Sequence, residues 1–270
     1  MDEENNRRDH DEHASLIKMP TIPITAYNET TIYSEGKQAF EAMLEAIAAA
    51  MHHIHNEFYI IRDDHLGSQF ERLLIRKAQE GCFSPPFTTF FDKRLNYRNH
   101  RKIVVVDGKI GFFGGLNIGD EYVGKNPKIG YWRDTHFSIT GDAVLWIQYT
   151  FLTDWYLAKE QIITYSVYYP IQKSQGKELV QIVKSGPDET ILEFIFSFII
   201  SAKKRIYIET PYFIPDPSIL LALKTAVHRG IDIRVIIPST PDKKIVYNAS
   251  LSYVQELLQA GVRFYCYDGL

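Results

Sequence analysis

The sequence predicts an α/β protein built from two related halves. Apolar residues at helical spacing alternate with short, strand-like apolar runs along most of the 270 residues. Hydrophobic residues make up 45% and charged residues 23% of the chain, which is the balance of a globular protein and excludes a disordered one. A pattern of strand, loop, helix and glycine occurs twice, from Tyr59 to Gly81 and from Tyr207 to Gly230.

The first half is predicted to span residues 31–158, after a polar tail or linker at 1–30. Its first helix is expected over 37–54, where apolar residues recur every three or four positions, and a buried strand is expected over 58–61. A second helix should end near Glu80, because Gly81 provides a C-terminal stop.

A β-hairpin is the strongest local prediction in this half. Two apolar runs, 103–106 and 110–113, flank Asp107-Gly108, a dipeptide that suits a type I′ turn. A helix over 142–158 should close the half. Residues 159–177 are predicted to connect it to the second half.

The second half, 178–270, is predicted to alternate strictly between strands and helices. Asp216 and Pro217 suit an N-cap followed by a first-turn proline. The predicted strands lie near 179–183 and at 206–208, 231–237 and 262–267, and the predicted helices lie at 189–203, 217–229 and 246–260.

Charge and cysteine content restrict the class of protein further. The net charge is −3, and two segments deviate from it: residues 1–13 carry −4 and residues 92–102 carry +4. Only two cysteines, Cys82 and Cys266, are present, which excludes a disulfide-dense secreted scaffold. Neither a signal peptide nor an apolar run long enough to span a bilayer is found, so we expect a chain that does not cross a membrane.

One motif carries specific chemistry. In a strand, His100 and Lys102 project to the same side, pairing an imidazole that can act as nucleophile with a cation for phosphate oxygens. Gly114 and Gly115 allow an oxyanion to approach backbone N–H groups, and Asn117 can add a donor. This set suits phosphoryl transfer through a phosphohistidine.

His100-x-Lys102-x4-Asp107 followed by Gly114-Gly115-x-Asn117 resembles the signature of the phospholipase D superfamily. The flanking segments 96–108, 114–122, 130–136 and 209–215 are similar to those of bacterial cardiolipin synthases, and the resemblance covers about residues 30–270. It implies a phospholipase D-like fold of two α/β halves, in which two such motifs form one active site without a metal or nucleotide cofactor.

The resemblance also implies a reaction and residue roles. One histidine attacks the phosphorus of phosphatidylglycerol, glycerol leaves, and a second phosphatidylglycerol accepts the phosphatidyl group to give cardiolipin. His100 would be the nucleophile, Lys102 and Asn117 would hold the phosphate, and Asp107 would orient a catalytic histidine. The implied partners are an anionic phospholipid and the membrane surface, at the cytoplasmic face of the cell membrane.

The sequence departs from this family in three ways. The N-terminal membrane spans that the resemblance implies are not found in it. His100 follows Gly81 by only 19 positions, too few for the strand and helix that the family has there, and no second His-x-Lys occurs in the chain. Both halves therefore look incomplete, and we expect the isolated chain to be impaired as a synthase. A single-motif hydrolase or nuclease that acts as a homodimer, or a non-catalytic lipid-binding remnant, are the alternatives. The acidic net charge disfavours nucleic acid as a partner.

Two other features are given structural roles. His52, His53 and His55 cluster near a predicted helix end without accompanying acids or cysteines, so no metal site is predicted. The segment from Trp132 to His136 is expected to support the active site, with Arg133 and Asp134 as an ion pair.

Overall fold

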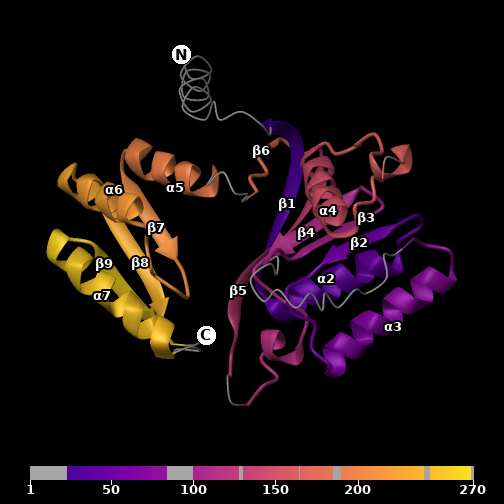
Figure 1. The fold of residues 1–270 in the computed structure, drawn as a ribbon, viewed down its shortest axis with the longest axis horizontal. Coiled ribbons are helices and arrows are strands. Elements are labelled where there is room, and N and C mark those ends of the chain that lie inside the picture. The colour runs from indigo at the N-terminus through magenta and orange to yellow at the C-terminus, as the bar shows by residue number, and fades with distance from the viewer. Residues whose placement is uncertain are drawn as a thin grey trace. The chain divides into compact units, whose positions relative to one another are not determined.

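The computed structural model describes residues 23–83, 100–127, 130–163, 165–184, 190–239 and 244–268. They belong to two compact units, one spanning Ile22–Ile182 and one containing Val183–Leu270 (Figure 1). The predictions for residues 84–99, including most of the basic segment and the short connection before His100, lie outside the described residues.

The first unit contains a six-stranded sheet in which every neighbouring pair of strands is antiparallel. The strands, in spatial order, are β2 (Ile54–Glu57), β3 (Ile103–Val106), β4 (Ile110–Gly114), β5 (Arg133–Gly141), β1 (Thr25–Glu35) and β6 (Glu178–Val180). The motif strand β3 therefore lies inside the sheet, between β2 and β4, and both neighbours restrain it.

The hairpin between β3 and β4 confirms the sequence prediction. Asp107 and Gly108 have φ angles of 52° and 64°, the left-handed values that a type I′ turn requires at both central positions. The Lys109 N–H donates a 3.0 Å hydrogen bond to the Val106 carbonyl and closes the turn.

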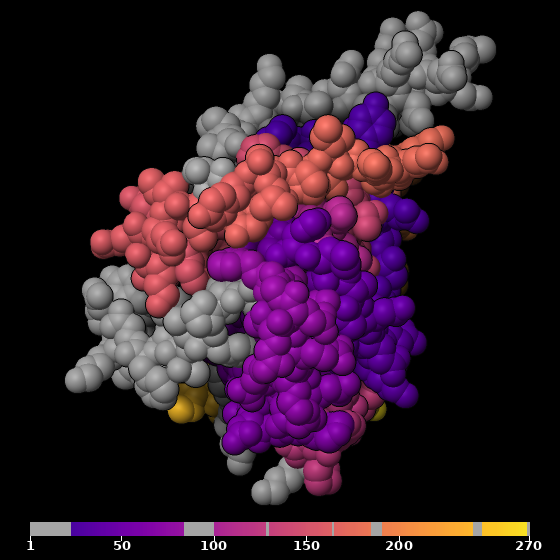
Figure 2. Space-filling view, turned by 90° about the vertical axis from the view of Figure 1, so that its right-hand side faces the viewer, coloured from indigo at the N-terminus to yellow at the C-terminus, as the bar shows by residue number. Residues whose placement is uncertain are grey.

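Alternation along β3 divides its side chains between two cores. Val104 and Val106 pack with helices α2 (Gly36–Ala48) and α3 (His65–Gln79). Ile103 and Val105 pack with helix α4 (Ala143–Lys159) on the opposite face (Figure 1). In the space-filling view, α3 lies on the outside of the unit beside α2 (Figure 2). The predicted ends of α3 and α4 agree with the structure to within one residue, whereas the helix predicted over 37–54 ends at Ala48, six residues early.

The second unit is a smaller parallel sheet with helices, as the alternation predicts. Its strands pair in the order β7 (Arg205–Glu209), β8 (Asp232–Pro238) and β9 (Arg263–Tyr267). Ile233, Val235 and Ile237 of β8 face a core shared with α5 (Thr190–Ser201), α6 (Pro217–His228) and α7 (Lys244–Ala260). Asp216 caps α6 by accepting the Ser218 N–H at 2.8 Å.

Three elements differ from the prediction. Residues 25–30, expected within the tail, begin the long strand β1. Most of β1 is exposed, and its fully buried Asn28 donates to the Glu178 carbonyl and accepts from the Ala143 N–H, so the strand lacks an apolar pattern. The strand expected at 58–61 lies earlier, at β2, where buried His55 occupies a position that an apolar residue would mark.

The strand predicted near residues 179–183 exists as β6 but pairs with β1, so it completes the first sheet and not the second. The Thr25 hydroxyl donates a 2.9 Å hydrogen bond to the Val180 carbonyl across this pair. Because the partners are separated by 155 positions, no local pattern indicates the pairing.

Candidate active site

His100 and Lys102 lie together immediately before β3, which begins at Ile103. The Lys102 ammonium is 2.7 Å from Nδ1 of His100 and 2.6 Å from the His100 carbonyl oxygen. Tyr59, from the loop after β2, packs beside both: its ring centroid is 4.4 Å from that of His100 and 5.6 Å from the Lys102 nitrogen. His100 is exposed, whereas Lys102 is only 4% exposed, so a solvent-facing imidazole is backed by a buried cation.

Burial changes the acid–base properties of this pair. Desolvation lowers the pKa of Lys102 to about 8, although the nearby charge of Asp134 partly opposes this shift. When Lys102 is charged it can only donate hydrogen bonds, so Nδ1 of His100 is the acceptor and the ring proton lies on Nε2. The lone pair on Nδ1 of the imidazole is then directed at the lysine.

The glycine pair lies against β5, where a side chain would not fit. A Cβ on Gly114 would come within 2.6 Å of His136, and one on Gly115 would come within 2.0 Å of the Asp134 carboxylate. The Gly115 N–H donates to the Thr135 carbonyl at 3.1 Å, so this amide is engaged within the fold. The glycines therefore bring the Asp134 carboxylate close to the chain that follows β4.

Asp134 lies in the segment that the sequence predicts to support the active site, and its electrostatic coupling to Lys102 is seen only in the structure. Burial raises its pKa, while the Thr135 N–H, which donates to its carboxylate at 2.7 Å, and the charge of Lys102 act in the opposite direction. The charge of the Arg133 guanidinium, expected as its ion-pair partner, also lowers the pKa of Asp134, and this guanidinium donates to the Asp134 backbone carbonyl at 2.8 Å. Asp134 is thus the carboxylate that is electrostatically coupled to Lys102.

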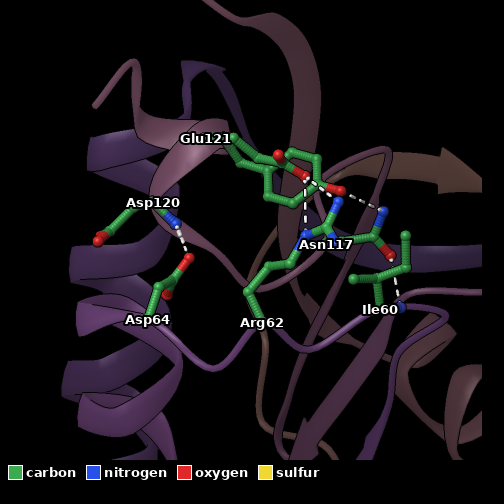
Figure 3. A network of polar contacts seen from close by, with 7 residues as sticks. Ile60, Arg62, Asp64, Asn117, Asp120 and Glu121 are labelled. Atoms are coloured by element: carbon green, nitrogen blue, oxygen red, sulfur yellow. Dashed lines mark hydrogen bonds and ion pairs between the residues drawn. The ribbon is translucent and has the colours of Figure 1, made fainter. Parts of the chain in front are cut away.

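Asn117 joins the motif to the loop after β2. Its side-chain carbonyl accepts the Ile60 N–H at 3.1 Å, and its amide donates to the Tyr122 hydroxyl at 3.1 Å (Figure 3). The same loop is held again by the ion pair of Arg62 with Glu121, at 3.0 Å (Figure 3). Asn117 is 7% exposed and holds in place the loop that carries Tyr59.

Asp107 lies at the opposite end of β3 from His100. Its carboxylate accepts three backbone N–H bonds, from Met51, His52 and His53, at 2.9, 2.7 and 2.9 Å. Burial alone would raise its pKa, but these bonds outweigh it and lower the pKa. The structure therefore gives Asp107 a role in fixing the loop before β2, not one beside His100.

The structure thus brings His100, Lys102 and the Gly114–Gly115 pair to one region of the sheet, with Tyr59 and Asp134 as additional members. The sequence places Tyr59 in a predicted strand and Asp134 in a structural ion pair, because no local pattern indicates the contacts that these residues make with segments far apart in the chain. Among the described residues no group of three or more histidine, cysteine, aspartate or glutamate side chains is placed to hold a metal.

The fold and the motif define a phospholipase D-like protein. A solved phosphatidylserine synthase of Haemophilus influenzae superimposes with a TM-score of 0.62 over 93% of this chain and 72% of that protein, at 14% identity, and so shows the fold. Residues 195–270 match the family described as cardiolipin synthase, PLD-like domain.

Comparison with curated proteins shows which phospholipase D-like proteins this chain is similar to in sequence. The chain is 44% identical to a cardiolipin synthase of Alkalihalophilus pseudofirmus, over 93% of this chain and 57% of that protein. It is 41% identical to cardiolipin synthase 2 of Bacillus cereus, over 98% of this chain and 60% of that protein. Over most of its length the chain is therefore similar to cardiolipin synthases, and it spans somewhat over half the length of these relatives.

Within the described part of the chain, no helix combines the length and the apolar character needed to cross a bilayer.

Proposed function

We propose that this chain forms one histidine–lysine half of the active centre of a cardiolipin synthase-type phosphatidyl transferase. Its substrate is phosphatidylglycerol, met at the cytoplasmic face of the cell membrane. The observation that carries the proposal is the buried Lys102 ammonium 2.7 Å from the exposed His100 imidazole. This pair provides a nucleophile and a phosphate-binding cation in one place.

The first step is phosphatidyl transfer to His100. The phosphate of phosphatidylglycerol draws Lys102 away from Nδ1, since a charged phosphodiester oxygen is a stronger acceptor than a neutral imidazole. The freed imidazole lone pair attacks phosphorus, a phosphorus–nitrogen bond forms, and the bond from phosphorus to the glycerol oxygen breaks. The leaving oxygen takes up a proton, and glycerol departs.

The second step regenerates the histidine. The terminal hydroxyl of a second phosphatidylglycerol loses its proton and attacks the same phosphorus, and the phosphorus–nitrogen bond breaks. Cardiolipin is released, with neither oxidation nor reduction and with all atoms accounted for. Both steps need an acid–base group besides the nucleophile, and such a group typically contributes ~10²–10⁴-fold in rate. This chain encodes one His-x-Lys motif, so we propose that it is impaired in isolation.

The test uses the purified chain and vesicles that contain phosphatidylglycerol labelled with ³²P in its phosphate. The full-length Alkalihalophilus relative is the positive control and His100→Ala is the negative control. We expect cardiolipin formation by the chain at about 1% or less of the relative's rate, in line with the loss of one acid–base group. Robust turnover by the chain that disappears in His100→Ala would contradict the impairment.

The same incubation tests the covalent step. We expect label on the chain that is stable in alkali and lost in acid, as a phosphoramidate is, and that is absent from His100→Ala. Label that persists in His100→Ala, or its complete absence from the chain after long incubation, would contradict the phosphohistidine intermediate.

A further inference from the structure

The residue between the two motif side chains lies on the other side of the strand. Since strand residues alternate, Arg101 projects to the face opposite His100 and Lys102, the face that α4 covers through Ile103 and Val105. The Arg101 guanidinium there forms an ion pair with the Asp154 carboxylate of α4. Both side chains are largely buried, with 22% and 17% of their surface exposed.

Asp154 is carried by a firmly held helix. Val144 and Ile147 of α4 are buried against Ile103 and Val105, which immediately follow the motif. Asp154 lies about two to three turns further along the same helix, so its position is fixed relative to β3. The Asp154 carboxylate, held on a rigid helix, can therefore restrain the rotation of residues 100–102, which precede β3.

Glu57 adds a second carboxyl group to this contact. It lies on β2 directly opposite Ile103, on the same face as Arg101. Burial, together with the neighbouring Asp154 charge, raises the pKa of Glu57 to about 8, and Arg101 opposes the shift. The groups that face Glu57 are thus Asp154 of α4 and Arg101 before β3, while His55, two residues back on β2, contacts Gln148. A protonated Glu57 donating to Asp154 leaves one net negative charge for Arg101.

We propose that Arg101, held by Asp154 and Glu57, is a positioning residue that fixes the orientation of His100 and Lys102 on the opposite face of the strand. The chain at 100–102 precedes the regular hydrogen-bonded strand, which begins at Ile103. The hydrogen bonds of the sheet therefore do not fix the rotation of residues 100–102. The ion pair of Arg101 with Asp154, which we call the Arg101 anchor, supplies this restraint. The inference extends the proposed function, since Lys102 is the phosphate-binding group that would be held.

The pKa of Lys102 shows whether the Arg101 anchor is intact, and it can be measured without an activity assay. In the anchored state burial keeps its pKa at about 8. If the segment rotates freely, Lys102 becomes hydrated and its pKa rises toward the ordinary value of about 10.4. The measurement is NMR of the ¹³C-lysine-labelled chain, with the Lys102 signal assigned from its loss in Lys102→Met.

Asp154→Asn is the decisive variant, because two explanations predict opposite signs. Removal of a negative charge would by itself lower the pKa of Lys102 or leave it unchanged, whereas loss of the anchor raises it. We expect a rise of at least one pH unit in Asp154→Asn and in Arg101→Gln. Arg101→Lys, which keeps an ion pair, should stay near the wild-type value. Arg234→Gln, which breaks an arginine–aspartate pair of 2.9 Å in the other unit, should leave Lys102 unchanged.

If Asp154→Asn does not fold, Arg101→Gln is measured at low salt and in about 0.5 M KCl, since added salt screens a direct charge effect but not an exposure effect. A rise that persists at high salt supports the anchor. A Lys102 pKa that stays near 8 in both variants, or a rise that vanishes with salt, overturns it. Binding of glycerophosphoglycerol to the same samples tests the proposed function separately: a wild-type chain with an anchored Lys102 that binds none of it would contradict that function alone.

Discussion

The ammonium of Lys102 bridges Nδ1 and the carbonyl oxygen of the same residue, His100, at 2.7 and 2.6 Å. The lysine thus covers the lone pair of the histidine that we propose as the nucleophile. A ligand that takes the ammonium both gains a cation and releases the imidazole. In the proposed mechanism, binding of the phosphate and activation of the nucleophile would therefore be the same event.

The first prediction concerns binding of glycerophosphoglycerol, a soluble phosphodiester whose charge is constant near neutral pH. Lys102 has a pKa of about 8, so its charge is present below that pH and is lost above it. We expect affinity to fall as pH rises through 8, and to fall about tenfold or more in Lys102→Met at pH 7, because a charge-assisted hydrogen bond is worth about 1.5–3 kcal/mol. Calorimetric titration measures both effects.

Lys109→Met is the matched control for that experiment, because Lys109 is an exposed lysine in the turn between β3 and β4. Its affinity should equal that of the wild type at every pH. An equal loss in both variants would mean that the phosphodiester responds to general surface charge and not to Lys102.

The second prediction concerns Gly115→Ala. Its Cβ would lie 2.0 Å from Asp134 Oδ1, so the carboxylate or the chain must move. We expect a loss of about 2–4 kcal/mol in the free energy of unfolding, within the range of severe steric substitutions. Urea denaturation measures it.

Gly81→Ala serves as the control, because Gly81 has a φ of 87° and no atom lies within 4 Å of the position that an added Cβ would take. It should cost only the backbone strain of about 1 kcal/mol. Equal losses in both variants would show that the Asp134 carboxylate moves aside without a cost in stability. The short distance between Gly115 and Asp134 would then have no structural importance.

The third prediction separates Asp107 from the chemistry. Asp107→Asn weakens three hydrogen bonds from backbone N–H groups, and we expect a loss of about 2–4 kcal/mol in unfolding free energy at pH 7. The lowered pKa of Asp107 means that its contribution is present above the ordinary aspartate value of about 3.9 and disappears as pH falls further. The difference in stability between variant and wild type should therefore shrink as pH falls below that ordinary value.

Phosphodiester affinity per folded molecule should be unchanged in Asp107→Asn. A variant that keeps its stability but loses affinity would restore the role beside a catalytic histidine that the family resemblance implied.

The fourth prediction concerns the pH dependence set by Glu57. Its pKa is raised to about 8, so between about 4.3 and 8 the unfolded state is ionised while the folded state holds its proton. Stability therefore decreases as pH rises through this window. Glu57→Gln stays neutral in both states, and we expect it to be more stable than wild type at pH 8, by on the order of 1 kcal/mol or a few degrees in Tm, with a smaller difference at pH 5.

Thermal unfolding from pH 5 to pH 8 measures this difference. Glu29→Gln, on the exposed side of β1, should show no such pH dependence. A Glu57→Gln variant that is equally destabilised at every pH would contradict a protonated Glu57 in the folded chain.

Local signals predicted those parts of the molecule whose partners lie nearby in sequence. The hairpin with its Asp107-Gly108 turn, the cap at Asp216 and the pairing of His100 with Lys102 all depend on residues within a few positions of one another. Each has a short-range physical cause that a sequence pattern records.

The remainder depends on contacts between distant segments. Arg101 and Asp154 are 53 positions apart, and Asn28 and Glu178 are 150 positions apart. Polar residues buried in such contacts take the place of apolar ones, so they remove the periodic signal as well. This is why β1, β2 and the Arg101 anchor were found only in the structure.

The most direct test of the central claim replaces the matching segment of the Alkalihalophilus synthase, 57% of that protein, with this chain, so that the relative supplies the rest of its length. The measurement is the rate of cardiolipin formation from labelled phosphatidylglycerol in vesicles. We predict that the chimaera is active and that His100→Ala abolishes its activity, while the isolated chain makes little or no cardiolipin. A folded chimaera that is inactive, or one whose activity survives His100→Ala, would contradict the claim that His100 and Lys102 form half of a phosphatidyl transferase centre.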